Sequence, residues 1–490
     1  MISAFKNKNK PYFYLAALCF GIFIAADDQT VIVTILPEVL IDMNIGINEL
    51  DKASWVITGY LIGYTAVLPF MGSVSDRIGW KNCYTISLLI FGVGSVLVGI
   101  SPYFVTLFPP GTDYAYWVMI SARVFQAVGG GAIIPITIAS ISTISPSISK
   151  PIAYGIVGAS AEAGAVIGPL WGGAVTHFTS WSWVFWINVP LVILTGWLAI
   201  MCPSGNTQSR KIDSISAVCF GLFVASMTIG FTRIGTPDIT MFACLFISVL
   251  FLLAIIIRHF IGLGNLFPKT LLSIKKFLWS NLTHFFVGSA LIITMLTVPL
   301  SCATIYGMNA LDSGLELLKF TVTLGVFALI GGISTRHYGS LIPSMIGLIV
   351  AALGLWAMSR WDANTLILYR SIHLMGAGAG FGLLIAPITH SALVNVQDDI
   401  KGLASSILTT SRILGMLVCL AILTSIGTFQ FHELVTGIPS FASDPETNKL
   451  IVDKTTDAVI EIFSLFFTWG AIACLAAVVP AIFMCKNKVR

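Results

Sequence analysis

Charged side chains are scarce in this chain: Asp, Glu, Lys and Arg together make up 10% of its 490 residues. Soluble domains carry roughly 25% charged residues, and here 56% of the residues are hydrophobic. This composition excludes a soluble globular enzyme and predicts a multi-pass integral protein of the cell (cytoplasmic) membrane, surrounded by the lipid bilayer. The net charge of +4 lies in short connections and tails, so we expect no nucleic-acid partner.

Motifs for metal binding and for hydrolysis are also missing. The nine cysteines are scattered, mostly within apolar stretches, without CxxC or Cys/His spacing. We therefore interpret them as small core residues and expect no metal site. Neither a GxSxG nor a Walker A motif is present, so we expect no enzyme, no bound nucleotide and no cofactor. Any active transport must draw on an ion gradient, and we expect a proton gradient.

Long apolar stretches fill most of the chain. A membrane-spanning helix needs about 20 mostly apolar residues. Fourteen segments predict such helices: 12–36, 54–72, 83–101, 116–140, 152–175, 182–201, 213–232, 240–261, 281–305, 315–333, 341–358, 364–388, 403–427 and 459–484. The predicted fold class is therefore an all-α polytopic membrane protein with 14 spans.

Basic residues set the predicted orientation. With the N-terminus in the cytoplasm, the inside segments hold 17 Lys and Arg residues, the outside segments hold 5, and 4 lie within spans. Cytoplasmic segments of membrane proteins carry this kind of excess. Both termini are therefore predicted to be cytoplasmic.

An internal repeat divides the chain. Arg123 and Gly129 in the fourth span have the same spacing as Arg370 and Gly376 in the twelfth. Many secondary transporters consist of two related halves, and two six-helix halves plus two inserted helices explain the offset. The predicted units are an N-terminal half (1–201), two inserted helices (202–262), a cytoplasmic linker (263–280) and a C-terminal half (281–490) with an outside loop (428–458).

Two adjacent carboxyls, Asp27 and Asp28, lie within the first apolar stretch. Charges inside a span are costly and usually functional. Neighbours on a helix point about 100° apart, so we expect one carboxyl to face a cavity and the other to pack or pair. The alternative is that the helix ends early and both lie among the outer headgroups, although residues 31–36 remain apolar.

A third carboxyl, Glu162, is predicted near the bilayer midplane in the fifth span. Burial there would favour its protonated form, which suits a proton or cation carrier. The alternative is a carboxyl that packs or forms a salt bridge. Arg123 could pair with such a carboxylate or reach the outer interface, and the same two interpretations apply to the other arginines in spans. The candidate coupling residues are Asp27, Asp28, Arg123, Glu162, Arg370 and Arg412.

A glycine stripe runs through the same fifth span. Gly164, Gly168 and Gly172 are spaced four residues apart and fall on one face, so a neighbouring helix can approach backbone to backbone. Pro169 removes a backbone donor and favours a bend. Together with Gly173, these residues predict a hinge in a close-packing face. The alternative is ordinary helix packing.

The connection between the second and third spans combines glycine with charge. Glycine permits close approach and a tight turn, while an acidic side chain can cap a turn or pair with a basic one across an interface. We predict an inside gating loop made by Gly72, Asp76, Arg77, Gly79 and Lys81. The alternative is a basic loop that only sets topology.

These patterns together resemble the major facilitator superfamily, and most of all its fourteen-helix drug/proton antiporter family. The matching stretches are Asp28–Pro37, residues 72–82, Arg123–Gly131 and Gly164–Gly173, with further likeness in Trp181–Pro190 and Gly402–Gly415. The resemblance covers nearly the whole chain. The family often has Asn at the place of Val33, Gly at Ala127 and Arg at Ser182.

The resemblance implies the major-facilitator fold and functional roles for Asp28, Arg123 and the two segments 72–82 and 164–173. Glu162 lies outside the shared motif. We expect a proton-coupled exporter of small amphipathic or cationic drugs that works by alternating access. The alternatives are export of a specific endogenous metabolite or lipid, and a non-transporting membrane sensor or scaffold, against which the intramembrane carboxylates argue.

Overall fold

The computed structural model of the chain describes residues 10–43, 45, 49–109, 112–144, 150–204, 213–264, 266–397, 400–436 and 445–485. Within these ranges the chain forms helices and turns, with no strand. The helices are α2 (Lys10–Asp42), α3 (Leu50–Val67), α4 (Met71–Ile78), α5 (Trp80–Gly99), α6 (Ser101–Leu107), α7 (Tyr114–Ile144), α8 (Lys150–Phe178), α9 (Ser182–Ile200), α10 (Ser214–Phe231), α11 (Ile239–Ile261), α12 (Lys269–Leu272), α13 (Lys275–Thr304), α14 (Ala310–Tyr338), α15 (Leu341–Met358), α16 (Ile367–Leu393), α17 (Lys401–Val435), α18 (Pro445–Ala476) and α19 (Val478–Cys485).

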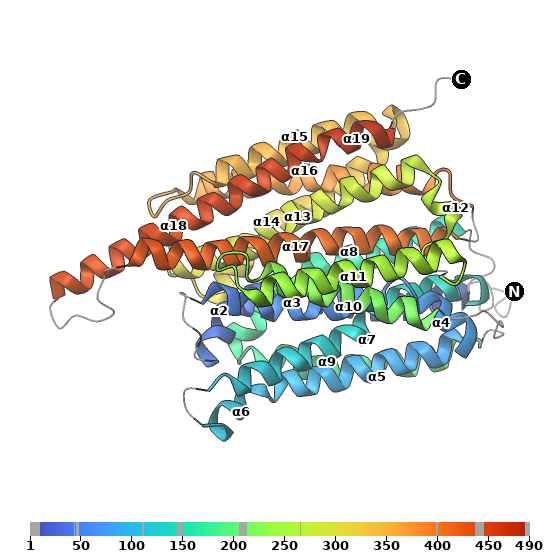
Figure 1. Cartoon of the computed structure of the whole chain (residues 1–490), viewed down its shortest axis with the longest axis horizontal. Helices are drawn as coiled ribbons and strands as arrows, with labels where there is room; N and C mark the ends of the chain where they lie inside the picture. The colour runs from blue at the N-terminus through green and yellow to red at the C-terminus, as the bar shows by residue number, and fades with distance from the viewer. Residues whose placement is uncertain are drawn as a thin grey trace, which may run out of the picture.

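The long helices lie side by side in one elongated bundle, with both ends of the chain at the same end of it (Figure 1). The basic residues predict that this end faces the cytoplasm, and we call it the predicted inner end. Helices form because a bilayer offers no water to backbone N–H and C=O groups, which must then pair within their own segment. Helical prolines such as Pro37, Pro169 and Pro299 are tolerated where neighbouring helices satisfy the freed groups.

Among the described residues, 12 helices are long and apolar enough to cross a membrane. They correspond to every predicted span except the second and the fifth. Helices α3 and α8 stand at those two places, and both are integral parts of the bundle. That they also cross the membrane, which would give 14 spans, stays a prediction, as does the cytoplasmic position of the termini.

The helices pack in two groups. Helices α2 and α8, α5 and α7, and α3 and α7 pack together within the first group, whereas α13 and α17, α14 and α16, and α15 and α16 pack within the second. The two groups meet where α8 packs on α14 and α3 packs on α17. Helices α10 and α11 pack on each other, and α10 also contacts α3 and α17. This agrees with two halves and an inserted pair, although the boundaries that we predicted for these units stay predictions.

Two predicted loops are largely helical, and those predictions were wrong. The connection after the second span contains α4, so only Gly79, with a φ of 93°, forms a turn before α5 begins. In the predicted outside loop 428–458, α17 continues to Val435 and α18 already begins at Pro445. Both helices extend beyond the rest of the bundle at the end opposite the termini (Figure 1).

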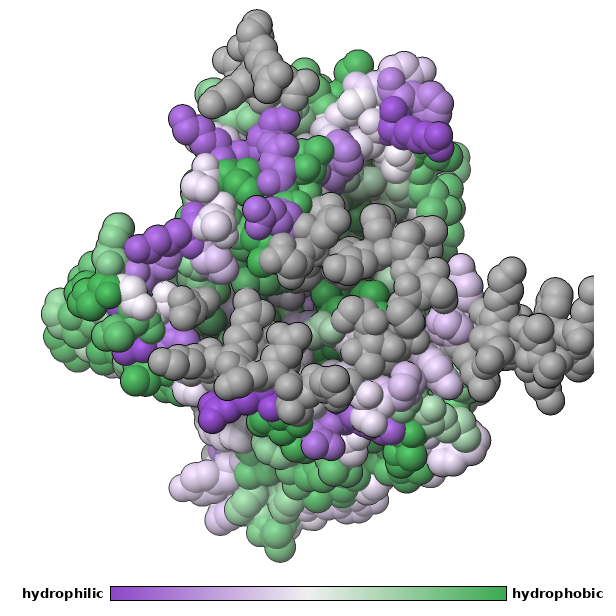
Figure 2. All heavy atoms as spheres, turned by 90° about the vertical axis from the view of Figure 1, so that its right-hand side faces the viewer, coloured by the Kyte–Doolittle hydropathy of each residue, from purple (hydrophilic) through white to green (hydrophobic). Residues whose placement is uncertain are grey.

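The surface follows the expectation for a bundle in lipid. Figure 2 looks onto the predicted inner end, where hydrophilic side chains gather on the face while hydrophobic side chains cover the flanks. Helix α11 is the extreme case: its most apolar window has a mean hydropathy of 2.9, and only 17% of that window is buried in the protein. Its apolar side chains therefore face lipid rather than a protein core.

Candidate functional site

A network of polar side chains lies fully buried in the first helix group, with Asp28 of α2 at its centre. Arg123 Nη1 donates to Asp28 Oδ2 at 2.7 Å, while Gln126 Nε2 and Asn188 Nδ2 each donate to Oδ1 at 2.9 Å. Gln126 Nε2 also donates to Ser95 Oγ at 2.8 Å. Helices α7 and α9 therefore contact the Asp28 carboxylate of α2 directly, and α5 joins the network through Gln126.

Arg123 has further partners within this network. Its guanidinium lies 4.3 Å from the ring centroid of Tyr60 and 5.3 Å from that of Phe185, and Nη1 also donates to Gln126 Oε1 at 2.7 Å. The Arg123 and Asp28 side chains are both 0% exposed. Burying an ion pair this deeply costs as much desolvation energy as the attraction returns, so stability alone does not explain it. Protonation of Asp28 would remove its charge and weaken its hold on Arg123.

Local sequence builds this network. Arg123 and Gln126 stand three residues apart and so share one face of α7. Helix α5 comes close enough to reach them because residue 94 is glycine: a Cβ there would lie only 2.5 Å from the Cα of Gln126. The next residue, Ser95, then supplies its hydroxyl to the network.

Asp27 occupies a different place. Helix α2 continues to Asp42, so the headgroup alternative is wrong for both carboxyls. Asp27 is 7% exposed, and its Oδ1 has no hydrogen-bond partner among the described residues. Asp28 is the carboxyl that pairs, as expected for one of the two. Neither carboxyl lines the cavity described next, whereas the following residues, Gln29 and Thr30, do.

This cavity lies between the two helix groups. It is lined by α2, α3 and α8 from the first group and by α13, α14 and α17 from the second, and its volume is ≈ 60 Å³. Eleven of the 16 lining side chains are apolar: Val33, Ile57, Leu61, Ala165, Val166, Leu291, Ile292, Met295, Phe320, Leu324 and Met416. The polar ones are Gln29, Thr30, Glu162, Thr321 and Arg412. In this closed arrangement the cavity has room for only a few water molecules.

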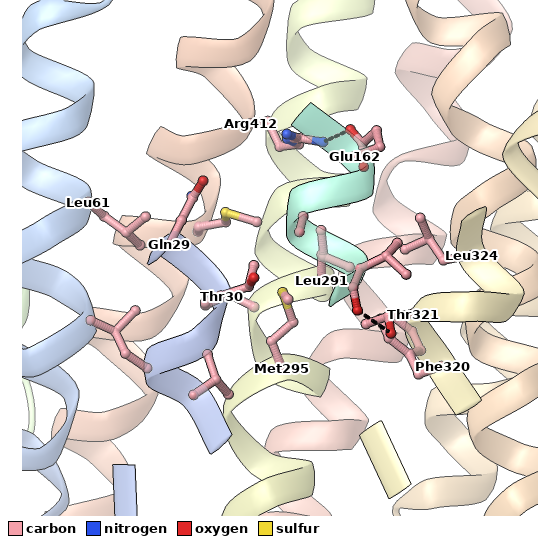
Figure 3. Close-up of a pocket in the computed structure, with 16 residues that line it drawn as sticks. Gln29, Thr30, Leu61, Glu162, Leu291, Met295, Phe320, Thr321, Leu324 and Arg412 are labelled. Atoms are coloured by element: carbon pink, nitrogen blue, oxygen red, sulfur yellow. Dashed lines mark hydrogen bonds and ion pairs between the residues drawn. The ribbon is translucent and has the colours of Figure 1, made fainter. Parts of the chain in front are cut away.

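An ion pair bridges the two groups at this cavity. Arg412 Nη1 of α17 lies 3.2 Å from Glu162 Oε1 of α8, and the two side chains point toward each other (Figure 3). They remain 24% and 27% exposed, respectively. Glu162 is thus a salt-bridged carboxyl, which was the alternative from the sequence. Arg123 is not its partner, as that arginine binds Asp28.

Arg370 lies apart from the other candidate residues. It is 3% exposed, its guanidinium lies 3.8 Å from the ring centroid of Tyr306, and its Nε and Nη1 have no hydrogen-bond partner among the described residues. Nearby in the same helix group, Lys319 Nζ binds Glu316 Oε1 at 2.7 Å. None of these residues lines the cavity.

The glycine stripe of α8 packs directly on α2. A Cβ at Gly168 would lie 2.8 Å from the carbonyl oxygen of Asp27, and one at Gly172 would lie 2.9 Å from that of Val31. Thr34 Oγ1 of α2 donates to the carbonyl oxygen of Pro169 at 3.0 Å. The helix that carries Asp27 and Asp28 is therefore held backbone to backbone against the helix that carries Glu162.

The end of the stripe contacts the other helix group. A Cβ at Gly173 would lie 2.6 Å from the carbonyl oxygen of Ala310, and one at Gly314 would lie 2.7 Å from that of Pro169. Thr321 Oγ1 donates to the carbonyl oxygen of Val166 at 3.2 Å. Helix α8 therefore contacts both α2 and α14 around Pro169. A bend of α8 at this proline would change the position of the two helix groups relative to each other.

Substitution of Gly168 by leucine is expected to destabilise the protein by about 1–3 kcal/mol or more, because the new side chain overlaps the backbone of α2. The matched control is Gly158→Leu on the same helix, where a Cβ would meet no described atom within 4 Å. Thermal unfolding of both purified variants in detergent measures the difference. Equal unfolding temperatures would contradict the packing of this stripe.

The predicted gating residues lie around α4 and the start of α5. Lys81 Nζ donates to the carbonyl oxygens of Ile200 at 2.6 Å and Cys202 at 3.0 Å. It therefore fastens α5 to the end of α9 within the same helix group, not across the two groups. Arg77 is exposed, Gly72 lies within α4, and the side chain of Asp76 lies outside the described residues.

Sequence comparison adds relatives of nearly equal length. A triacylglyceride transporter of Mycolicibacterium hassiacum is 30% identical over 84% of this chain and 78% of its own. A triacylglyceride transporter of Mycobacterium tuberculosis is 28% identical over 97% of this chain and 94% of its own. These bacterial relatives and the apolar helices establish a multi-pass integral protein of the cell membrane.

Solved transporters share the fold. A bacterial homologue of the human lysosomal transporter Spinster, in an inward-facing conformation, matches with a TM-score of 0.64 at 13% identity and covers 98% of this chain and 100% of its own. A D-xylose–proton symporter matches with a TM-score of 0.63 at 12% identity, covering 95% of this chain and 97% of its own. The model of the Major Facilitator Superfamily matches residues 18–420. The chain therefore belongs to the Major Facilitator Superfamily.

Proposed function

We propose that this transporter moves neutral, acylglycerol-type lipids and that proton binding at Asp28 drives the movement. The observation that carries the substrate class is the likeness to triacylglyceride transporters over nearly the whole chain. The cavity agrees with it, since apolar side chains from both helix groups form most of its wall. Export of a specific metabolite or lipid was the first alternative from the sequence.

The charges in the cavity favour a lipid over a cationic drug. Glu162 is the one acidic side chain among the described residues that line it, and Arg412 already neutralises that carboxylate at 3.2 Å. A cationic drug would have to displace the arginine to gain an ion pair. An uncharged lipid needs only apolar surface and a few polar contacts to its ester groups, which Gln29, Thr30 and Thr321 offer.

Movement of the two helix groups is needed for such a substrate. Ligand pockets usually measure roughly 300–1,000 Å³, whereas this cavity has ≈ 60 Å³. A lipid can therefore enter only after the contacts between α8 and α14 and the Glu162–Arg412 pair have separated. Alternating access supplies this separation, first toward one side of the membrane and then toward the other.

Helix α2 is suited to couple the proton to this movement. One of its faces carries Asp28 in the buried network, and the next residues, Gln29 and Thr30, line the cavity. Another face of α2 packs on the glycine stripe of α8. Protonation of Asp28 would release Arg123 and let α2 and α8 shift together, and deprotonation would restore the network.

Reconstitution into liposomes tests this function. Vesicles that contain the protein and a fluorescent triacylglycerol should transfer the lipid to acceptor vesicles faster when a pH gradient is imposed, and a protonophore should abolish the gain. Vesicles without protein are the control. Efflux of a lipophilic cation such as ethidium under the same gradient, without lipid transfer, would favour the drug exporter instead. Movement of neither compound would favour a sensor or scaffold.

A further inference from the structure

A second and larger pocket lies away from the cavity, where the inserted helices meet the linker before α13. It has a volume of ≈ 650 Å³, within the range of small-molecule sites. Its wall comes from the end of α11, the start of α10 and the linker that contains α12. Figure 1 shows α12 at the end of the bundle where both termini lie.

The apolar part of this wall continues the lipid-facing side of α11. Ile256 and Phe260 line the pocket and are 39% and 75% exposed, respectively. On the linker side, Phe267 lies edge-on to Phe220 with ring centroids 6.0 Å apart, and Leu271 in α12 of the linker is fully buried. The pocket is thus open toward lipid on one side and closed by packed side chains on the other.

Arg258 anchors the end of α11 beside the pocket. Its Nη2 donates to Asp213 Oδ1 at 2.9 Å, and its Nε donates to Ser216 Oγ at 3.1 Å. Helix α11 ends at Gly262, whose φ of 81° lets the linker turn back toward α10. Asp213 and Arg258 neutralise each other here, so neither contributes a free charge to the pocket.

The remaining charge at the pocket is basic. Lys269 lines it together with the polar side chains of His259, Ser216 and Ser273, and no acidic side chain does so among the described residues. The sequence has no Asp or Glu anywhere in residues 239–311. The Lys269 ammonium therefore lies next to an apolar wall, at the predicted inner end of the bundle. Basic pockets of this kind on the cytoplasmic side bind anionic headgroups.

We propose that this pocket binds one anionic phospholipid of the cytoplasmic leaflet. Its phosphate would lie at Lys269, with hydrogen bonds from Ser273 and His259, and one acyl chain would run along Ile256 and Phe260. The ligand is bound at a site separate from the transport cavity, because the two pockets share no lining residue. Bound there, the lipid would join the inserted pair to the linker that leads into α13.

Native mass spectrometry of the purified, delipidated full chain tests this site. Titration with dioleoylphosphatidylglycerol should give one bound lipid at the lowest concentrations. Dioleoylphosphatidylcholine, whose headgroup has no net charge, should bind at least about five-fold more weakly, as expected for the loss of one favourable basic contact. Inorganic phosphate alone should neither bind nor compete. Competition by phosphate would mean that a free anion occupies the site, and equal binding of both lipids would overturn the charge argument.

Two matched pairs of variants locate the binding. Ile256→Trp fills the apolar wall and should remove the tightly bound lipid, whereas Ile257→Trp, on the neighbouring position that is 53% exposed and outside the pocket, should retain it. Lys269→Gln should weaken phosphatidylglycerol binding about five-fold, whereas Lys275→Gln in the same basic segment should not. All four positions are exposed, so the variants should fold. Unchanged lipid binding in Ile256→Trp and Lys269→Gln would overturn the proposal.

Discussion

Replacing Asp28 by asparagine is expected to abolish proton-driven transport while the protein still inserts and folds. The substitution keeps the size of the side chain but removes the group that could take up a proton. Asparagine has one acceptor oxygen, whereas Asp28 accepts from Arg123 on one oxygen and from Gln126 and Asn188 on the other. The variant therefore also disrupts the network.

Loss of stability accompanies this loss of coupling. Arg123 is completely buried, and removing the partner of a buried charge costs about 3–5 kcal/mol in soluble proteins. The matched control is Asp27→Asn, which changes the adjacent carboxyl, whose Oδ1 has no hydrogen-bond partner in the part of the chain that the structure describes. We expect this control to retain transport.

Two measurements separate coupling from folding. Thermal unfolding in detergent should show a folded but less stable Asp28→Asn protein. Exchange of labelled lipid between vesicles at equal pH on both sides should persist, while transfer driven by a pH gradient should vanish. Gradient-driven transport at the rate of the unmodified protein would remove Asp28 from the mechanism. Loss of transport in Asp27→Asn alone would assign the proton to Asp27 instead.

Most of the fold could be predicted because each helix depends mainly on its own stretch of sequence. Apolar runs of about 20 residues dictate helices in lipid, and this requirement identified the helices of the bundle. The two wrong loop predictions concern polar segments that are helical in the structure. Residues 428–458 carry five acidic side chains and were predicted to be a loop, yet α17 continues to Val435 and α18 begins at Pro445. Hydropathy does not detect a helix that extends beyond the membrane.

The site could be predicted only in part, for a different reason. Costly charges in spans pointed to Asp28, Arg123, Glu162 and Arg412 one by one, but their pairing depends on which helices are neighbours. Glu162 and Arg412 stand 250 residues apart, and nothing in the sequence joins them. The partners Gln126, Asn188 and Ser95 were not proposed as site residues. The spacing of Arg123 and Gln126 on one helix face was the available signal for the first of them.

Neutralising either member of the Glu162–Arg412 pair is expected to lower the rate of lipid transport about tenfold, which corresponds to roughly 1.4 kcal/mol. The two side chains are about a quarter exposed. Loss of an exposed surface ion pair costs about 0.2–1 kcal/mol, and loss of a fully buried pair costs more. We therefore expect an energy between these two limits. Glu162→Gln leaves a lone guanidinium, and Arg412→Gln leaves a lone carboxylate, within an apolar wall. A lone charge there retains water and opposes entry of a lipid.

Combined variants distinguish the pair from its individual charges. The double variant Glu162→Gln with Arg412→Gln leaves no lone charge and should transport faster than either single variant. The exchanged pair, Glu162→Arg with Arg412→Glu, restores an attraction between α8 and α17 and should recover most of the original rate. Initial rates of fluorescent triacylglycerol transfer from liposomes compare all five proteins. If the exchanged pair is no faster than the single variants, Glu162 and Arg412 act separately, and the bridge between the two helix groups is not what the transport cycle uses.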